Sequence, residues 1–180
     1  MCGRYEFALG DDPKSKQIKE RAYKMNLVFK QGEIFPSDNV LCMIPVETKI
    51  DLSVMKWGIQ SKSFQINARL ESINEKASYK EYKNNRCAVI CNGFYEWDKD
   101  KNKYYIKIDE DIFYLGCIFN SNNELLIITK DAEDKLNNIH NRIPIIMNQK
   151  EMISYIHNED IIFEDKKLNI KKIDEDLRLF

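Results

Sequence analysis

The middle of the chain reads RCAVICNGFYEW from Arg86 to Trp97. Two short segments rich in branched and aromatic residues, Arg86–Cys91 and Phe94–Trp97, flank the dipeptide Asn92-Gly93. Short segments of this composition are typical of β-strands, and Asn-Gly is typical of tight turns. This part of the sequence therefore predicts two strands separated by a turn.

Segments of the same kind continue on both sides. The further strands that we expect are residues 2–7, Val40–Val46, Leu52–Gly58, Tyr104–Ile108, Phe113–Phe119, Leu125–Thr129 and Ile143–Met147. Predicted helices lie nearer the ends, at Pro13–Val28, Asn74–Lys83, Asp131–Ile139 and Lys150–His157, before a charged tail that ends at Phe180. We therefore predict an α+β fold, in which one domain over residues 1–180 has a curved, barrel-like antiparallel β-core flanked by a few short helices.

Length and composition fit one globular domain. The 180 residues are 43% hydrophobic, which is enough apolar material for one packed core. Because no apolar segment approaches the roughly 18 residues of a membrane span and the first residues lack a signal-peptide pattern, we expect a cytoplasmic monomer without membrane contact. Five cysteines, an odd number in a chain without an export signal, argue against a disulfide framework.

Charge limits the ways in which the chain could bind nucleic acid. The net charge of -1 excludes coating of duplex DNA by bulk charge, so any DNA site must be local. Among 28 basic residues only six are arginines, and three of these follow a polar residue by two positions, in the pairs Cys2/Arg4, Asn67/Arg69 and His140/Arg142. In an extended backbone, residues two positions apart face the same side. A guanidinium group can bind two oxygens of one phosphate at the same time. The pattern favours a phosphate-binding track, with ordinary ion pairs as the alternative.

Cys2 is the residue with the most distinctive chemistry. Removal of Met1 would leave an α-amine and a thiol on the same residue, a 1,2-aminothiol. Because an α-amine has an ordinary pKa of about 7.7–8.0, its neutral form can attack an aldehyde, and the thiol can then close a thiazolidine ring. The alternative is that Cys2 is only a small buried strand residue.

Two further residues are suited to proton transfer. Glu96 stands among aromatic residues, where loss of solvent raises the pKa of a carboxyl, although a strand glutamate facing water is the alternative. His140 lies in an apolar context and carries the imidazole that most often acts as acid or base near neutral pH. A histidine held in the core is the alternative for His140.

Five motifs in order resemble those of the SOS-response-associated peptidase family. They are Met1-Cys2-Gly3-Arg4-Tyr5, Trp57-Gly58, Ile66-Asn67-Ala68-Arg69-Leu70-Glu71-Ser72, Arg86-Cys87 leading to Gly93-Phe94-Tyr95-Glu96-Trp97, and Ile139-His140-Asn141-Arg142-Ile143-Pro144. Each motif alone is a weak signal, whereas five in register over positions 1–147 are specific.

The resemblance implies a DNA-repair enzyme of the SOS response that needs no cofactor or metal and acts on single-stranded DNA containing abasic sites. It implies that Cys2 forms a covalent thiazolidine crosslink with the sugar aldehyde, beside self-processing peptidase activity and lyase activity. Asn67 would position the sugar or the Cys2 amine, Glu96 would shuttle protons, and His140 would assist ring opening and reversal. For DNA contacts it implies phosphate binding by Arg4, Arg69 and Arg142, and base stacking by Trp57 or Trp97, with a place in the core as the alternative for both and the one that we favour for Trp97. Bound to DNA, the protein would be associated with the nucleoid.

Two other functions fit parts of the sequence. Glutamine amidotransferases with an N-terminal nucleophile also begin Met-Cys-Gly and use an Asn-Gly pair, which Asn92-Gly93 resembles. A non-catalytic single-strand nucleic-acid module would use the arginines and aromatic residues and leave Cys2 without a role. A zinc site at Cys87 and Cys91 is disfavoured, because one C-x3-C pair without a second pair is a poor zinc site.

Overall fold

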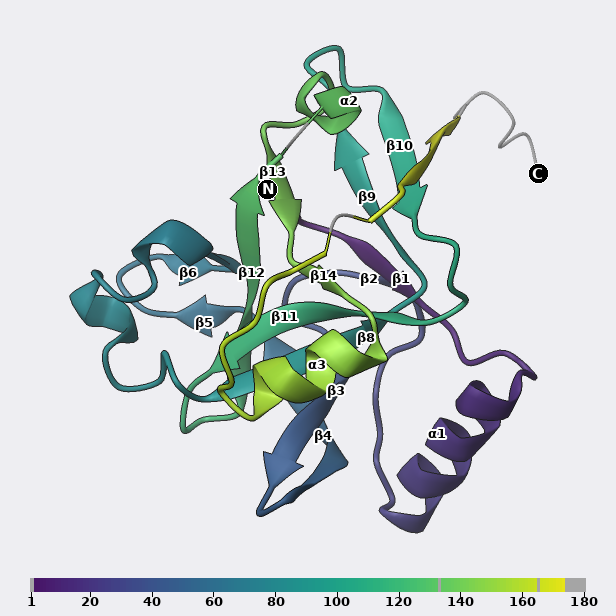
Figure 1. Ribbon diagram of the computed structural model, residues 1–180, viewed down its shortest axis with the longest axis vertical. Helices are drawn as coiled ribbons and strands as arrows, with labels where there is room; N and C mark the ends of the chain where they lie inside the picture. The colour runs from purple at the N-terminus through teal and green to yellow at the C-terminus, as the bar shows by residue number, and fades with distance from the viewer. Residues whose placement is uncertain (1, 133, 165, 174–180) are drawn as a thin grey trace.

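Most of the described chain is β-strand, arranged in two curved sheets and a small hairpin (Figure 1). The computed structural model describes residues 2–132, 134–164 and 166–173. One sheet has five strands in the order β15 (Asn169–Ile173), β10 (Lys103–Lys107), β9 (Gly93–Trp97), β1 (Tyr5–Phe7) and β2 (Gly32–Ile34). The hairpin pairs β5 (Ile59–Gln60) with β6 (Phe64–Gln65).

The larger sheet closes on itself. It has eight strands, in the order β13 (Arg142–Pro144), β12 (Glu124–Asp131), β4 (Lys49–Trp57), β3 (Asn39–Val46), β8 (Arg86–Cys91), β11 (Phe113–Phe119) and β14 (Ile146–Met147), with β7 (Asn67–Arg69) paired to β12. Because β12 pairs with β11 as well as with β4, five strands form a ring. The predicted curved, barrel-like core is confirmed, although β12 runs parallel to β4 and β7.

The Asn92-Gly93 pair does not make the predicted hairpin. β8 pairs with β3 and β11, whereas β9 pairs with β1 and β10, so the chain passes from the larger sheet to the smaller one at this point. A Cβ atom on Gly93 would lie 2.3 Å from the ring of Tyr105, so only glycine allows this close approach. The segment Asp98–Asn102 and the turn between β11 and β12, by contrast, do close hairpins.

The core fills the space between the sheets. Its largest fully buried side chains include Trp57, Tyr5, Tyr114, Phe7, Phe94 and Phe113. The alternation of buried and partly exposed positions along β9 follows the two faces of a strand. This alternation decides which side chains of β9 face the interior.

Two helices flank the sheets as expected. α1 (Pro13–Lys24) begins with an Asp12 cap on the Ser15 amide at 2.9 Å, and ends before the predicted Val28 because Asn26 takes a left-handed conformation with φ 52°. α3 (Gln149–Ile156) agrees with the prediction, starts with a capping box and packs on β8 and β11. None of the helices in the described part of the chain has the length and apolar character needed to span a bilayer.

Two predicted helices differ from the structure. In place of a helix at Asn74–Lys83 the chain has turns and one 3-10 helix (Ala77–Tyr79) without a side-chain cap, besides another 3-10 helix (Leu70–Ser72). The helix predicted from Asp131 shortens to α2 (Asp134–Asn137), because Asp131 still belongs to β12.

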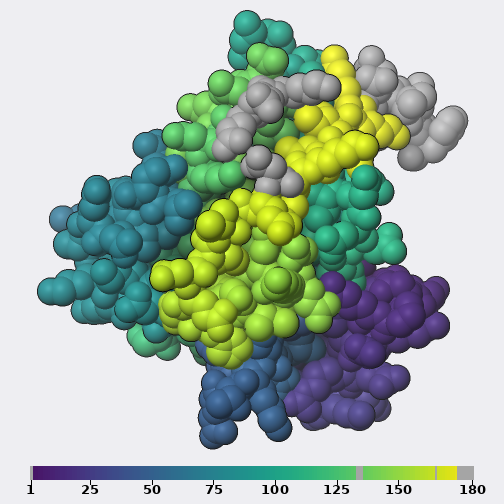
Figure 2. All heavy atoms as spheres, viewed as in Figure 1, coloured from purple at the N-terminus to yellow at the C-terminus, as the bar shows by residue number. Residues whose placement is uncertain are grey.

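The charged tail, for which no strand was predicted, contains the strand β15. Residues after α3 lie across one face of the molecule, where Phe163, Leu168 and Ile170 pack against the core (Figure 2). The remainder of the tail, residues 174–180, lies outside the described residues.

Candidate active site

Cys2 lies just before β1, and its side chain is fully buried. Burial raises the pKa of its thiol far above the ordinary value, and the negative charge of Glu96 raises it further. The Tyr95 amide donates to the Arg4 carbonyl, so β9 continues alongside residues 2–4 and brings Glu96 to the neighbourhood of Cys2. The thiol is therefore protonated at neutral pH, unlike the thiolate that a cysteine protease uses for attack.

Glu96 faces the interior from β9, on the same side as Phe94, and is 3% exposed. Burial raises the pKa of this carboxyl to about 7. The alternative of a strand glutamate facing water is therefore wrong. A carboxyl with a pKa near 7 is suited both to donate and to accept a proton under physiological conditions.

His140 precedes β13 and is partly buried. Its Nδ1 accepts a hydrogen bond of 3.0 Å from the Arg142 amide, so in the neutral ring Nε2 carries the proton. Burial lowers the pKa of the imidazole, and the positive charge at the amino terminus is the second cause. That charge is also the second influence on the pKa of Glu96, where it opposes burial.

Asn67 belongs to β7, which lies beside β12 with Asn67 opposite Ile127. Its Nδ2 donates to the Ile127 carbonyl at 3.5 Å. Its Oδ1 is buried and has no hydrogen-bond partner within the described residues. Because an unsatisfied buried acceptor is costly, this oxygen is a candidate to receive a hydrogen bond from a substrate or from an amine.

The three arginines differ in their surroundings. Arg69 is exposed at the end of β7. Arg142 is buried, and its guanidinium donates two bonds of 3.0 Å to Glu71, one of 2.6 Å to the Thr129 carbonyl and another to Asp131. For Arg142 the structure therefore shows the ion pairs that were the alternative to a phosphate site. Arg4 is partly exposed.

Only one of the three predicted residue pairs, Asn67 and Arg69, lies within a single strand. Asn67 and Arg69 both belong to β7, whereas Cys2 lies outside β1 and His140 lies outside β13. The reasoning that an arginine two positions later must face the same way applies only within a strand.

The two tryptophans exchange the roles that the sequence suggested. Trp57 is 0% exposed, donates from Nε1 to the Ile66 carbonyl at 3.0 Å and packs against Tyr5, so it has no ring face for a DNA base. The predicted stacking role of Trp57 does not fit this position. Trp97, which was favoured as a core residue, is instead partly exposed on the outer side of β9.

The Asn-Gly pair proposed for an amidotransferase lies elsewhere. The Asn92 side chain accepts from the Ala8 amide at 2.6 Å and donates to the Asp111 carbonyl at 2.7 Å. The Asn92 amide bonds to Glu6, several residues along β1 from Cys2. Its side chain therefore serves the backbone of this loop and does not form an oxyanion site at Cys2.

Three residues near Arg4 were not predicted. Glu33 lies 3.2 Å from Arg4 and 2.7 Å from Lys103, and the ring of Phe35 lies 4.3 Å from the Arg4 guanidinium carbon. Lys103 is one of 22 lysines, and no local pattern distinguishes it. Only the pairing of β10 with β9, which sets Lys103 opposite Trp97, brings it to this place.

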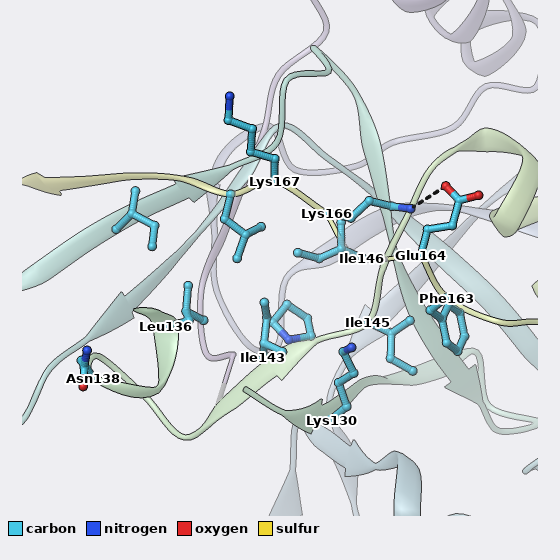
Figure 3. A pocket seen from close by; sticks show the side chains of 13 residues that line it. Lys130, Leu136, Asn138, Ile143, Ile145, Ile146, Phe163, Glu164, Lys166 and Lys167 are labelled. Atoms are coloured by element: carbon cyan, nitrogen blue, oxygen red, sulfur yellow. Dashed lines mark ion pairs between the residues drawn. The ribbon is translucent and has the colours of Figure 1, made fainter. Parts of the chain in front are cut away.

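A pocket lies apart from the predicted site residues. It has a volume of about 700 Å³ and lies between β12 to β14 and residues 163–170, with Ile143, Ile145 and Phe163 among its apolar walls (Figure 3). Lys166 bridges to Glu164 at its edge. None of the predicted site residues lines it. Within the described residues, no group of three or more His, Cys, Asp or Glu side chains is arranged to hold a metal ion.

Known proteins resemble the chain over most of its length. It is 27% identical over 186 residues to the abasic site processing protein YoqW of Bacillus subtilis, covering 86% of this chain and 80% of that one. It is 28% identical over 145 residues to the abasic site processing protein HMCES of Xenopus tropicalis, covering 57% of this chain and 43% of that one.

Solved structures share the fold. A crystal structure of a protein from Bacteroides thetaiotaomicron matches with a TM-score of 0.75 and 20% identity, covering 97% of this chain and 93% of that one. The family model for SOS response associated peptidase (SRAP) matches residues 1–178. The chain therefore belongs to the SOS response associated peptidase family.

Proposed function

We propose that this chain processes abasic sites in single-stranded DNA by capturing the aldehyde of the ring-opened sugar through Cys2. The name that the relatives share, abasic site processing protein, supports the class of substrate. The observation that carries the proposal is the buried pair of Cys2 and Glu96, in which the carboxyl has a pKa of about 7. Such a pair can supply and remove protons beside a reactive amino terminus.

The first step exposes the nucleophile. Water hydrolyses the peptide bond before Cys2, Met1 leaves as the free amino acid, and Cys2 gains an α-amine. Met1 itself lies outside the described residues. This self-processing is the peptidase activity that we assign to the site.

The second step forms the crosslink. The amine attacks the aldehyde carbon, the oxygen leaves as water, and an imine forms. The Cys2 sulfur then bonds to the imine carbon while the thiol proton passes to the nitrogen, which closes a thiazolidine ring. The raised pKa of the thiol fits this order, because a protonated thiol leaves the first attack to the amine.

Three side chains assist these steps. Glu96 takes the proton from the attacking amine and returns it to the departing oxygen. The buried Oδ1 of Asn67 accepts a hydrogen bond from the amine and orients its lone pair. His140, with its proton on Nε2, donates to the sugar oxygen during ring opening and during reversal.

The arginines serve the DNA in different ways. Arg69 and Arg4 bind flanking phosphates, because both retain exposed surface. Arg142 acts from within the protein, since its guanidinium joins Glu71 to β12 and its amide orients His140. Trp97 and Phe35, both partly exposed, are better placed than Trp57 to contact a base.

A denaturing gel tests the proposal. Protein with Met1 loss verified by intact mass is mixed with single-stranded DNA that carries one abasic site. We expect a slow band that survives denaturant, disappears in Cys2→Ala and persists in Cys42→Ala, a matched change at another buried cysteine. Absence of the band from processed protein that still binds the DNA would favour the non-catalytic module and overturn the proposal.

A further inference from the structure

One carboxylate and two cations form a cluster on the outer side of the five-stranded sheet. Glu33 on β2 accepts from Lys103 Nζ at 2.7 Å and from Arg4 Nη1 at 3.2 Å, through the same oxygen, Oε1. No sequence motif pointed to Lys103 or Glu33. Because both cations contact the same oxygen of Glu33, a change in one of the three groups alters the interactions of the other two.

Lys103 is the buried member of this cluster. It is 4% exposed, and its ammonium lies 4.2 Å from the ring centre of Tyr95 and 5.7 Å from that of Trp97. A buried ammonium is costly unless a carboxylate and aromatic faces compensate for its lost hydration. Partial burial opposes the ionisation of Glu33, but hydrogen bonds from Lys103 and then Arg4 hold the pKa of this carboxyl below its ordinary value. Glu33 is therefore ionised at neutral pH.

Arg4 is the accessible member. Its side chain is 29% exposed, and its guanidinium carbon lies 4.3 Å from the ring centre of Phe35 and 4.9 Å from that of Trp97. Within the described residues, Nη1 is the Arg4 atom that donates to a carboxylate. The two rings fix the plane of the guanidinium, and a fixed fork of donors suits phosphate oxygens.

The charges of the cluster decide what Arg4 can do. Arg4 and Glu33 alone would cancel, so that an approaching phosphate would meet no net charge. With Lys103 included, these three groups carry a net charge of +1, and Glu6, which lies opposite Glu33 on β1 and accepts from Tyr95 Oη at 2.9 Å, adds a carboxylate that is the same in all the variants compared below. Lys103 also makes the shorter contact with Glu33, which leaves Arg4 the less tightly held of the two cations.

We propose that Lys103 is a positioning residue for DNA, which neutralises Glu33 and thereby leaves the charge of Arg4 available to a phosphate beside Cys2. Lys103 does not touch the DNA, because its ammonium is enclosed by Glu33 and the two rings. This inference rests on the proposed function, since it assumes that the strand passes Arg4.

A measurement of non-covalent binding separates an effect of Lys103 on DNA affinity from an effect on crosslink formation. The probe is a single-stranded oligonucleotide with one tetrahydrofuran abasic analogue, which lacks the aldehyde and cannot form the crosslink. Its Kd is measured over a range of sodium chloride concentrations for the wild type, Lys103→Met and the double variant Lys103→Met/Glu33→Gln. Lys24→Met, at an exposed position on α1, is the matched control for loss of one lysine.

The predicted charge of the three-residue cluster is +1 in the wild type. Lys103→Met leaves zero, so binding weakens about fivefold at 0.1 M salt and the slope of log Kd against log salt falls by about 0.7, as expected for one lost phosphate contact. The double variant returns the cluster to +1, so both quantities recover to the wild-type values. Lys24→Met changes neither the affinity nor the slope.

Recovery of DNA binding in the double variant distinguishes an effect of charge from an effect on the fold. If Lys103 supports the fold through its contacts with Tyr95 and Trp97, removal of Glu33 as well does not restore binding, and that result overturns the inference. Should Lys103→Met unfold, the double variant still decides, because it contains no uncompensated buried charge. If the wild type binds the oligonucleotide and Lys103→Met binds equally well, the inference alone fails, whereas a wild type that does not bind overturns the proposed function too.

Discussion

Replacement of Glu96 by Gln removes a carboxyl that burial keeps from ionising easily. Its pKa in the folded protein is about 7, against an ordinary value of 4.5. Gln has nearly the same shape and carries no charge at any pH. The variant therefore isolates the cost of holding a negative charge at this 3% exposed position.

The sign and size of the effect follow from proton linkage. The folded pKa is above the unfolded one, so the folded state binds the proton more tightly and the wild type loses stability as pH rises from 4.5 through 7. The shift corresponds to about 3 kcal/mol when the loss is complete, and to about 2.5 kcal/mol between pH 5 and pH 8. Glu96→Gln lacks this loss, so its stability advantage over the wild type grows by that amount.

Urea unfolding at pH 5 and pH 8 measures the difference directly. Glu33→Gln is the matched control, because the pKa of Glu33 is lowered and its stabilising contribution is lost only as pH falls below about 4.5, so its difference from the wild type stays nearly constant between pH 5 and pH 8. A free energy difference between the wild type and Glu96→Gln that stays constant between the two pH values would refute the reasoning. The same variant should lose abasic-site crosslinking while it gains stability at pH 8.

Further substitutions test other parts of the site. Arg142→Met leaves the Thr129 carbonyl and two carboxylates without their donor, so we expect the free energy of unfolding to fall by about 2–3 kcal/mol in urea titrations, whereas Arg69→Met at an exposed site stays within about 0.5 kcal/mol. His140→Gln should slow crosslink formation about 100-fold in a quenched time course without changing the Kd for tetrahydrofuran DNA. Trp57→Phe removes a buried hydrogen bond and should lower thermal stability by about 1 kcal/mol, with DNA affinity unchanged because the ring is fully buried. Equal effects of Arg142→Met and Arg69→Met on stability, an unchanged rate in His140→Gln, or weaker DNA binding by Trp57→Phe would each contradict the corresponding assignment.

Local patterns predicted much of the fold. The strand over Phe94–Trp97 and the helix that begins at Pro13 depend on neighbouring residues, and the structure agrees with both. The Asn-Gly pair was misleading, because whether such a dipeptide closes a hairpin depends on which strands compete for its flanks. Likewise β15 is a strand only because the exposed edge of β10 pairs with it.

In the candidate site as well, features set by neighbouring residues could be predicted, whereas contacts between distant residues could not. Burial of Glu96 could be predicted, because its aromatic neighbours and strand phase are visible in the sequence. The carboxylates that bind Arg142 could not, since Glu71 is 71 positions away and reaches it only through the pairing of β7, β12 and β13. The contact of Lys103 with Glu33 joins residues 70 positions apart and had no local signal either.

The most direct test of the central claim is the intact mass of the adduct between the processed protein and an oligonucleotide with one abasic site. We predict a mass equal to the protein without Met1 plus the DNA minus one water molecule, formed without a reducing agent and absent in Cys2→Ala. That stoichiometry is expected for a thiazolidine, which retains no carbon–nitrogen double bond and needs no reduction to survive denaturation. An adduct that appears only after borohydride treatment, or that persists in Cys2→Ala, would show capture through a lysine imine and contradict the role of Cys2.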